Sequence, residues 1–424
     1  MKLLRESCDV AIIGGGPAGS AAGTRLAQAG LRVTILEKEK FPRFAIGESL
    51  LPHGNDLLQE IGVWEKLESA GFLRKYGAEF ATADGERSHR LWFGDNLAPR
   101  HEFTYQVERA SFDQLLLSHA RENGCTVHEE TRVTSLSDPD APQMTLQVEG
   151  PDGPREVSAR WVVDASGRCA FAGSRAGLRR RVTQKARRVA IYAHFEGAVR
   201  HEGKAEGHIT IVRTAGGWFW LIPLAGDRMS VGLVLPAGQV RGGTAEELAA
   251  VFEEALAHAP AAAARLQNAR RTTPLRATGD YSWKFGSFAT RRILLTGDAA
   301  GFVDPIFSSG VMLALRSGLR AADLLLKAER RGRALHPWER FAYTRSVTGW
   351  MNRYARLIRA FYDRAGFEVF MSPQPVLHIP RSVARLVGGQ TDPGPADRFR
   401  LRLFDFFCRL QRRLDIVPPI PSLR

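Results

Sequence analysis

A glycine pattern near the N-terminus is typical of a site that holds a dinucleotide. Residues 9–13 predict a short buried strand, and Gly14-x-Gly16-x-x-Gly19 follows it at once. Such glycines let the backbone approach a pyrophosphate, and the N-terminus of the following helix offers unpaired N–H groups to the phosphates. Glu37 ends the next predicted strand, where a carboxylate can accept hydrogen bonds from ribose hydroxyls. The spacing therefore predicts a dinucleotide-binding βαβ unit.

Later segments resemble the motifs of FAD-dependent monooxygenases. They are Trp161–Arg168, Ile293–Gly301 with Asp298, Arg109 at the start of a predicted helix, and Arg43–Pro52. The dinucleotide motif occurs once, so the resemblance implies FAD and no second nucleotide cofactor. The residues implied to bind FAD are Gly14, Gly16, Ala18, Gly19, Glu37, Arg43, Glu48, Ser49, Arg109, Asp298, Gly301 and Pro305.

The segment Trp218–Pro223 reads WFWLIP and resembles the WxWxIP hexapeptide of flavin-dependent halogenases. Trp218 and Trp220 alternate along a predicted strand, so both indoles point to one face. Bulky rings between flavin and organic substrate would block direct oxygen transfer, leaving a small halide ion as the acceptor. The resemblance therefore implies a catalytic role for both tryptophans, although a core strand with two aromatic residues has the same pattern.

Residues 72–80 resemble the halogenase segment that carries an essential lysine, here Lys75. Hypohalous acid is diffusible and indiscriminate, whereas an amine can hydrogen-bond it or capture it as a haloamine. Either interaction places electrophilic halogen beside one ring carbon. Desolvation would lower the pKa of such an amine and increase its reactivity. The alternative is a lysine that is only a surface charge.

Residues 302–310 fit FxxPxxSxG, a pattern associated with halogenases of phenols and pyrroles. The resemblance implies a halide site at Ser309 and Gly310 and a catalytic role for Ser308. The N-terminus of the helix predicted to follow would favour an anion. Phe307 stands where tryptophan halogenases carry a glutamate that helps to deprotonate the indole intermediate. We therefore expect a phenol or pyrrole rather than free tryptophan.

The net charge is +14, and most of it lies in the last quarter of the chain. From Arg316 onward, the sequence contains 21 lysines and arginines but only 9 aspartates and glutamates. Such a field attracts acidic partners, although a solvated arginine-rich surface is an equal alternative. No nucleic-acid-binding motif accompanies the charge, so we expect no nucleic-acid partner. The charge instead motivates an acyl- or peptidyl-carrier protein that presents the ring.

Residues 398–414 predict a basic amphipathic helix with apolar positions Phe399, Leu403, Phe406, Phe407, Leu410 and Leu414. Its apolar stripe suits a lid, a carrier-protein contact or a membrane surface, and these alternatives stay open.

Four cysteines lie far apart among 424 residues, without metal-ligand spacing. This pattern predicts a reducing, cytoplasmic setting and no metal site. No run of eighteen apolar residues occurs, so we expect no membrane span. The oligomeric state, monomer or dimer, stays open.

We predict an α/β fold in three parts. They are a Rossmann-like FAD-binding domain of the aromatic-hydroxylase type (1–75, 105–175 and 280–333), an antiparallel substrate-side sheet (76–104 and 176–279) and a helical C-terminal lid or partner region (334–424). Within the second part, residues 245–267 predict one alanine-rich helix that Thr244 and Glu247 start as a capping box.

The resemblance, which covers about the first 335 residues, implies a halogenase that uses O2 and chloride or bromide. A separate flavin reductase would supply the reduced FAD transiently. Two alternatives share the glycine motif: an FAD-dependent aromatic hydroxylase and a prenyl-type flavin reductase. A third is a catalytically silent flavoprotein that docks a carrier protein. None of the three gives Lys75 a role.

Overall fold

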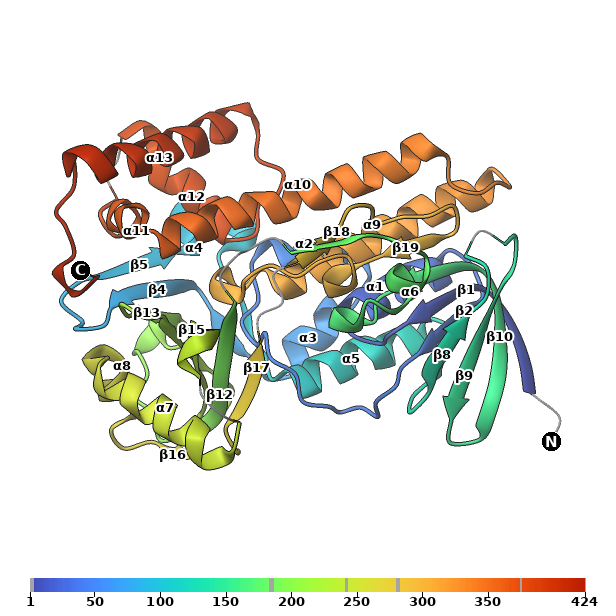
Figure 1. Ribbon diagram of the computed structural model, residues 1–424, viewed down its shortest axis with the longest axis horizontal. Coiled ribbons are helices and arrows are strands. Elements are labelled where there is room, and N and C mark those ends of the chain that lie inside the picture. Colours follow the sequence, from blue (N-terminus) through green and yellow to red (C-terminus); the bar gives the residue numbers. More distant parts are fainter. Residues whose placement is uncertain are drawn as a thin grey trace.

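The computed structural model describes residues 4–139, 141–182, 187–240, 243–279, 283–373 and 376–423. Within these residues, two large β-sheets form the framework and helices cover their outer faces (Figure 1). The predicted α/β fold with a Rossmann-like FAD-binding part is confirmed.

The first sheet is built on parallel strands, in the order β7-β2-β1-β10-β9-β8, with β19 on β10. Its apolar run Val10–Ile13 is almost fully buried, as expected for a strand covered on both faces. Helices α1 (Pro17–Gln28), α5 (Arg109–Glu122) and α9 (Gly310–Arg330) pack together beside it. The strands are β1 (Leu4–Ile13), β2 (Val33–Leu36), β7 (Thr126–His128), β8 (Arg132–Leu136), β9 (Met144–Gly150), β10 (Gly153–Asp164) and β19 (Ile293–Leu295).

The second sheet, in the order β16-β12-β15-β14-β13-β4-β5 with β17 on β12, is mainly antiparallel. Its register places Trp220 between Gly232 and Ile211, so that one face carries both predicted tryptophans. Phe219 and Leu221 point to the other face, under helices α7 and α8 (Figure 1). The strands are β4 (Gly77–Thr82), β5 (Ser88–Trp92), β12 (Arg188–Glu196), β13 (Ile209–Arg213), β14 (Trp218–Pro223), β15 (Arg228–Pro236), β16 (Arg270–Arg271) and β17 (Arg276–Gly279).

The helix predicted at residues 245–267 is two helices, α7 (Ala245–Ala257) and α8 (Pro260–Leu266). The expected capping box is present: Thr244 Oγ1 accepts from the Glu247 N–H, and the Glu247 carboxylate accepts from the Thr244 N–H. The single-helix prediction was wrong because Pro260 has no N–H to continue the helical ladder.

A helical layer closes the C-terminal part of the molecule. It comprises α10 (Pro337–Tyr362), α11 (Arg364–Met371), α12 (Ile379–Val387) and α13 (Pro395–Leu414). In α13 the buried residues are Asp397, Phe404, Cys408 and Gln411, whereas Phe399 and Phe406 are at least half exposed. Within the apolar stripe predicted from the sequence, Leu403 and Phe407 are partly buried against the core. The stripe therefore lies at the edge of the face by which this helix packs.

Smaller elements complete the chain. They are α2 (His53–Glu60), α3 (Trp64–Ser69), β3 (Leu73–Lys75), α4 (Phe93–Asn96), β6 (Thr104–Gln106), α6 (Phe171–Arg175), β11 (Arg180–Val182) and β18 (Trp283–Phe285). In the described part of the chain, no helix combines the length and apolarity needed to cross a bilayer. Nor do the described residues bring three metal-ligating side chains together.

Candidate FAD and halide site

A cavity of about 600 Å³ lies between the carboxyl ends of the parallel strands and the inner face of the second sheet. Its size is in the range of small-molecule sites, and parallel α/β sheets bind ligands at this edge. Most of the residues predicted for the site line it: Gly14, Gly16, Ala18, Glu37, Arg43, Glu48, Ser49, Arg109, Trp218, Trp220, Asp298, Pro305, Ser308 and Gly310.

Four predicted site residues lie outside the lining as the described residues define it: Gly19, Gly301, Ser309 and Lys75. Gly19 and Gly301 allow close backbone packing. A Cβ on Gly19 would lie 1.9 Å from the Gly14 carbonyl oxygen, and one on Gly301 would lie 2.7 Å from the Lys284 Cβ. Both glycines therefore shape the site through the backbone.

The glycine loop fits a pyrophosphate. Gly14 has a φ of +103°, and a Cβ there would meet the Ala165 carbonyl oxygen at 2.4 Å. Gly16, the N-cap of α1, has only the Arg43 guanidinium within 4 Å of an added Cβ. A cation and a helix N-terminus thus face an open backbone position, as a diphosphate requires. Glu37 accepts from the Gly15 N–H at 2.7 Å.

A buried carboxylate that the sequence analysis missed holds two of the predicted arginines. Asp113 is fully buried and accepts two hydrogen bonds from Arg109, at 2.7 and 2.8 Å. It also lies 3.3 Å from the Arg43 guanidinium. Burial opposes the charge of Arg109, but Asp113 outweighs it, so the pKa of Arg109 is raised. The four-residue spacing on one helix is the signal that indicates Asp113.

Asp298 lines the cavity in the turn after β19. Burial raises the pKa of Asp298 to about 6, although the positive charges of Arg168 and Arg109 act in the opposite direction. A carboxyl group in this environment can accept a hydrogen bond from a sugar hydroxyl when ionised and donate one when protonated.

Hydrogen bonds and close packing fix the positions of the two tryptophan rings. Their ring centroids lie 5.9 Å apart, and both rings are nearly fully buried. Trp220 Nε1 donates to Ser230 Oγ at 3.2 Å. Opposite it, Gly232 leaves room for the indole, because a Cβ there would come within 2.1 Å of Trp220 Cζ2. The strand β14, which carries both tryptophans and is called the tryptophan strand below, therefore holds the Trp220 ring in one position.

Trp218 belongs to a hydrogen-bonded chain that reaches the C-terminal helices. Its Nε1 donates to the Tyr362 hydroxyl at 2.7 Å, and that hydroxyl donates to Asp304 Oδ2 at 2.9 Å. Burial, together with the Asp304 charge, raises the pKa of Tyr362 well above its ordinary value. The phenol therefore stays protonated and available to donate. Neither Tyr362 nor Asp304 was predicted from the sequence.

Lys75 is 1% exposed at the end of β3. Its Nζ donates to Ser49 Oγ at 2.8 Å and to the Leu50 carbonyl oxygen at 3.0 Å. Ser49 lines the cavity, so one hydroxyl separates the amine from the cavity wall. Burial lowers the pKa of Lys75 to about 7. This shift favours the uncharged, nucleophilic form of the amine.

The predicted halide segment combines a helix N-terminus with an unpaired hydroxyl. Ser309 is the N-cap residue of α9, whose first residue is Gly310. Ser309 Oγ is buried and has no hydrogen-bond partner among the described residues. Ser308, with a φ of +54°, and Gly310 line the cavity beside it. Free N–H groups and an unsatisfied O–H suit an anion.

Four phenylalanines gather beyond the cavity on the same sheet face as Trp220. Phe80 in β4 packs edge-on against Phe370 in α11, with ring centroids 4.8 Å apart. Phe307 and Phe361 join this aromatic cluster, and all four rings are buried. The structure thus closes this side of the tryptophan strand with side chains from β4, the 305–307 turn, α10 and α11.

A buried ion pair, also unpredicted, adjoins the cavity. His194 Nε2 lies 2.9 Å from Glu48 Oε1, and both residues are almost fully buried. Burial alone would lower the pKa of His194, but the hydrogen bond and charge of Glu48 outweigh burial and raise it. The sequence alone could not have paired residues 146 positions apart.

Comparisons with known proteins agree with this geometry. The FAD binding domain family matches residues 7–337. The tryptophan 2-halogenase of Chondromyces crocatus is 34% identical over 85% of this chain and 69% of its own length. The 1H-pyrrole-2-carbonyl-[peptidyl-carrier protein] brominase of Pseudoalteromonas luteoviolacea is 32% identical over 91% of this chain and 92% of its own length.

Among solved structures, the flavin-dependent brominase Bmp2 superposes with a TM-score of 0.82 at 28% identity. The match covers 96% of this chain and all of that one. Relatives so similar over most of both chains share the fold and the FAD site, and residues of the predicted glycine, tryptophan and FxxPxxSxG motifs line the cavity. The chain belongs to the family of flavin-dependent halogenases.

Proposed function

We propose that this halogenase chlorinates or brominates a phenol or pyrrole ring carried by an acyl- or peptidyl-carrier protein, and that Lys75 delivers the halogen. The observation that carries the proposal is the buried amine of Lys75, with a pKa of about 7, one hydroxyl away from the flavin cavity. Two relatives named for carrier-bound pyrrole support the substrate class.

The FAD-binding residues divide into three groups. Gly14 and Gly16 with the α1 N-terminus would hold the diphosphate, Glu37 the adenosine ribose, and Asp298 the ribityl chain. When bound in its reduced form, supplied by a separate flavin reductase, FAD provides the two electrons that activate O2. One O2, one halide ion, one further proton and reduced FAD then balance to one hypohalous acid, one water and oxidised FAD.

The halide would lie at the N-terminus of α9, where the Ser309 hydroxyl lacks a partner and Gly310 lines the cavity. Trp218 and Trp220 would keep the organic ring away from the flavin, since their positions are fixed by hydrogen bonds and by the space at Gly232. A molecule as small as hypohalous acid can pass where a ring cannot.

Lys75 would act in two balanced steps. Its neutral amine attacks the halogen of hypohalous acid, forming an N–halogen bond and releasing water. The ring carbon then takes the halogen from nitrogen, the ring loses a proton, and the amine is regenerated after it gains that proton. The low pKa of Lys75 favours the first step, because a protonated amine has no lone pair.

The identity of the ring rests on Phe307, which belongs to the aromatic cluster and offers no base. A phenol or pyrrole donates electrons from its own heteroatom and has less need of one. The relatives' names include both tryptophan and pyrrole substrates, so the expectation against an indole stays a prediction.

The test combines the protein, a flavin reductase, O2 and either halide with pyrrole-2-carboxylate, free or bound to a carrier protein. Mass spectrometry should find a halogenated carrier-bound ring, less product with the free acid, and a difference that shrinks at high salt. Lys75→Met should release hypohalous acid to a small-molecule trap while forming no halogenated ring. Equal rates with both substrates at every salt concentration would reject the tether, and a hydroxylated product independent of halide would favour a hydroxylase.

A further inference from the structure

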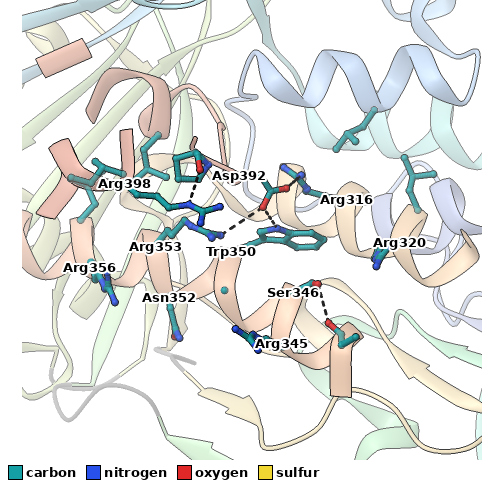
Figure 2. Close-up of a pocket in the computed structure, with 18 of the residues that line it drawn as sticks. Arg316, Arg320, Arg345, Ser346, Trp350, Asn352, Arg353, Arg356, Asp392 and Arg398 are labelled. Atoms are coloured by element: carbon teal, nitrogen blue, oxygen red, sulfur yellow. Dashed lines mark hydrogen bonds and ion pairs between the residues drawn. The ribbon is translucent and has the colours of Figure 1, made fainter. Parts of the chain in front are cut away.

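A second cavity, of about 870 Å³, is a surface groove formed by α9, α10 and α13 (Figure 2). Seven arginines line it, against four acidic side chains. Within each helix they lie three, four or eight residues apart, as in Arg316 and Arg320 of α9 and in Arg398 and Arg402 of α13. Each helix thus presents an arginine stripe to the same hollow.

Three of the four acids in the groove are in ion pairs. Glu60 and Asp323 both pair with Arg25, and Asp392 pairs with Arg316. The carboxylate of Asp392 accepts from Trp350 Nε1 at 3.1 Å, lies 3.9 Å from the Arg353 guanidinium and is paired with Arg316 (Figure 2). Asp392 therefore neutralises part of the arginine charge in the groove.

Other arginines of the groove have no such partner. In the described part of the chain, no carboxylate oxygen lies within 4.0 Å of the charged nitrogens of Arg320, Arg345 or Arg356, and all three are exposed. Arg356 acts on Asp405 only through its charge, without an ion pair. Arg345 and Arg356 are eleven residues apart on α10, which corresponds to about 16 Å along the helix axis. Charges spread over this length suit a surface carrying several carboxylates better than a single small anion.

The same face of α10 carries an exposed aromatic pair. Trp338 is 65% and Phe341 51% exposed, and their ring centroids lie 5.3 Å apart. Exposed aromatic side chains beside arginines are typical of protein–protein interfaces, where both residue types are enriched. A protein partner with apolar and acidic side chains is the occupant that fits both features.

We propose that this arginine groove is the docking surface for the acidic carrier protein that presents the ring. The inference rests on the proposed function, because that reaction requires a carrier. It adds where the carrier binds: across α9, α10 and α13, with its carboxylates on Arg320, Arg345 and Arg356 and an apolar side chain on Trp338 and Phe341.

The groove shares its helices with the catalytic side of the molecule. Helix α10 begins beside the aromatic pair and ends at Phe361 and Tyr362, which touch the aromatic cluster and Trp218. Helix α13 packs on α11, which carries Phe370 of the same cluster. A carrier protein in the groove would therefore contact the helices that cover one side of the tryptophan strand. This is the ring side, on which the proposed aromatic substrate binds.

The variant Arg345→Glu/Arg356→Glu reverses two unpaired charges in the groove. Its matched control is Arg330→Glu/Arg413→Glu, which reverses two exposed arginines of α9 and α13 outside it. Substrates are pyrrole-2-carboxylate on an acidic peptidyl-carrier protein and the same acid as a thioester of free pantetheine. Only the first can use a docking surface.

We expect the groove variant to raise KM for the carrier-bound ring about tenfold or more at low salt. Its kcat/KM for the pantetheine thioester, and both parameters of the control variant, should match the wild type. An unchanged KM for the carrier-bound ring, or an equal loss with both substrates, would overturn the docking surface.

Fluorescence anisotropy with the labelled carrier protein separates this inference from the proposed function. If the wild type binds the carrier through the groove but halogenates only the free thioester, the surface stands and the tethered substrate is rejected. If a DNA duplex or anionic vesicles bind the wild type more tightly than the carrier does, and the groove variant loses that binding, the groove has a different partner and the inference fails.

Discussion

Replacing Lys75 by methionine tests the central feature of the site without requiring any cofactor. The side chain is fully buried, and its folded-state pKa of about 7 lies well below the ordinary value of 10.5. Between these pH values the unfolded chain binds more protons than the folded one, so wild-type stability rises with pH across this window. Below pH 7 the folded protein must carry a buried ammonium, and the penalty is then largest.

The linkage relation gives the size of the effect. The lysine penalty is about 5 kcal/mol near pH 6.5 and about 2 kcal/mol near pH 9. Lys75→Met removes the titrating group, so its stability advantage over the wild type should fall by about 2 to 3 kcal/mol between these pH values. Urea unfolding of both proteins at both pH values measures this difference. Lys327→Met, at an exposed lysine of α9, is the control and should show no such change. A pH-independent difference for Lys75→Met would refute a low pKa and with it the neutral nucleophile.

Three further predictions concern the cavity. Gly232→Ala should displace the Trp220 indole, lower the free energy of unfolding by about 1 to 3 kcal/mol, and reduce halogenated product per O2 consumed; Gly238→Ala, where an added Cβ meets nothing, should do neither. Asp113→Asn should weaken FAD binding about tenfold or more in a fluorescence titration, because two arginines lose their buried counter-charge; unchanged affinity would contradict that role. Ser309→Ala should raise KM for halide several-fold without lowering stability, since its hydroxyl has no protein partner to lose; a lowered unfolding midpoint with unchanged KM would assign Ser309 to packing.

The sequence predicts the fold and a core set of residues that line the cavity, because both follow from local patterns. The glycine turn, the carboxylate that ends the second strand and the alternation of Trp218 and Trp220 depend on neighbours a few residues away. Pro260 is also a local signal, and it separates α7 from α8 within the single helix predicted at residues 245–267. The pairing of Glu48 with His194, and the contact of Trp218 with Tyr362, depend on how distant segments meet in space. No periodicity in a single chain encodes such pairs.

The face by which α13 packs could not be read from its apolar pattern for a related reason. The helix carries apolar residues on more than one side, and only contact with α11 and α12 selects Phe404 and Cys408 as the buried ones. A hydrophobic stripe predicts an amphipathic helix but not which side of the helix packs against the rest of the protein.

The phenylalanines around Phe80 come from segments nearly 300 residues apart, and none of them lines the flavin cavity. Under the proposed function, the shape of the side where the ring binds can therefore be altered at Phe80, Phe307, Phe361 or Phe370 without replacing a residue that lines the flavin cavity. Evolution or protein engineering could then change the accepted aromatic substrate by replacing these phenylalanines with smaller residues. The proposed selectivity for the ring and the flavin chemistry would then depend on different residues of one chain.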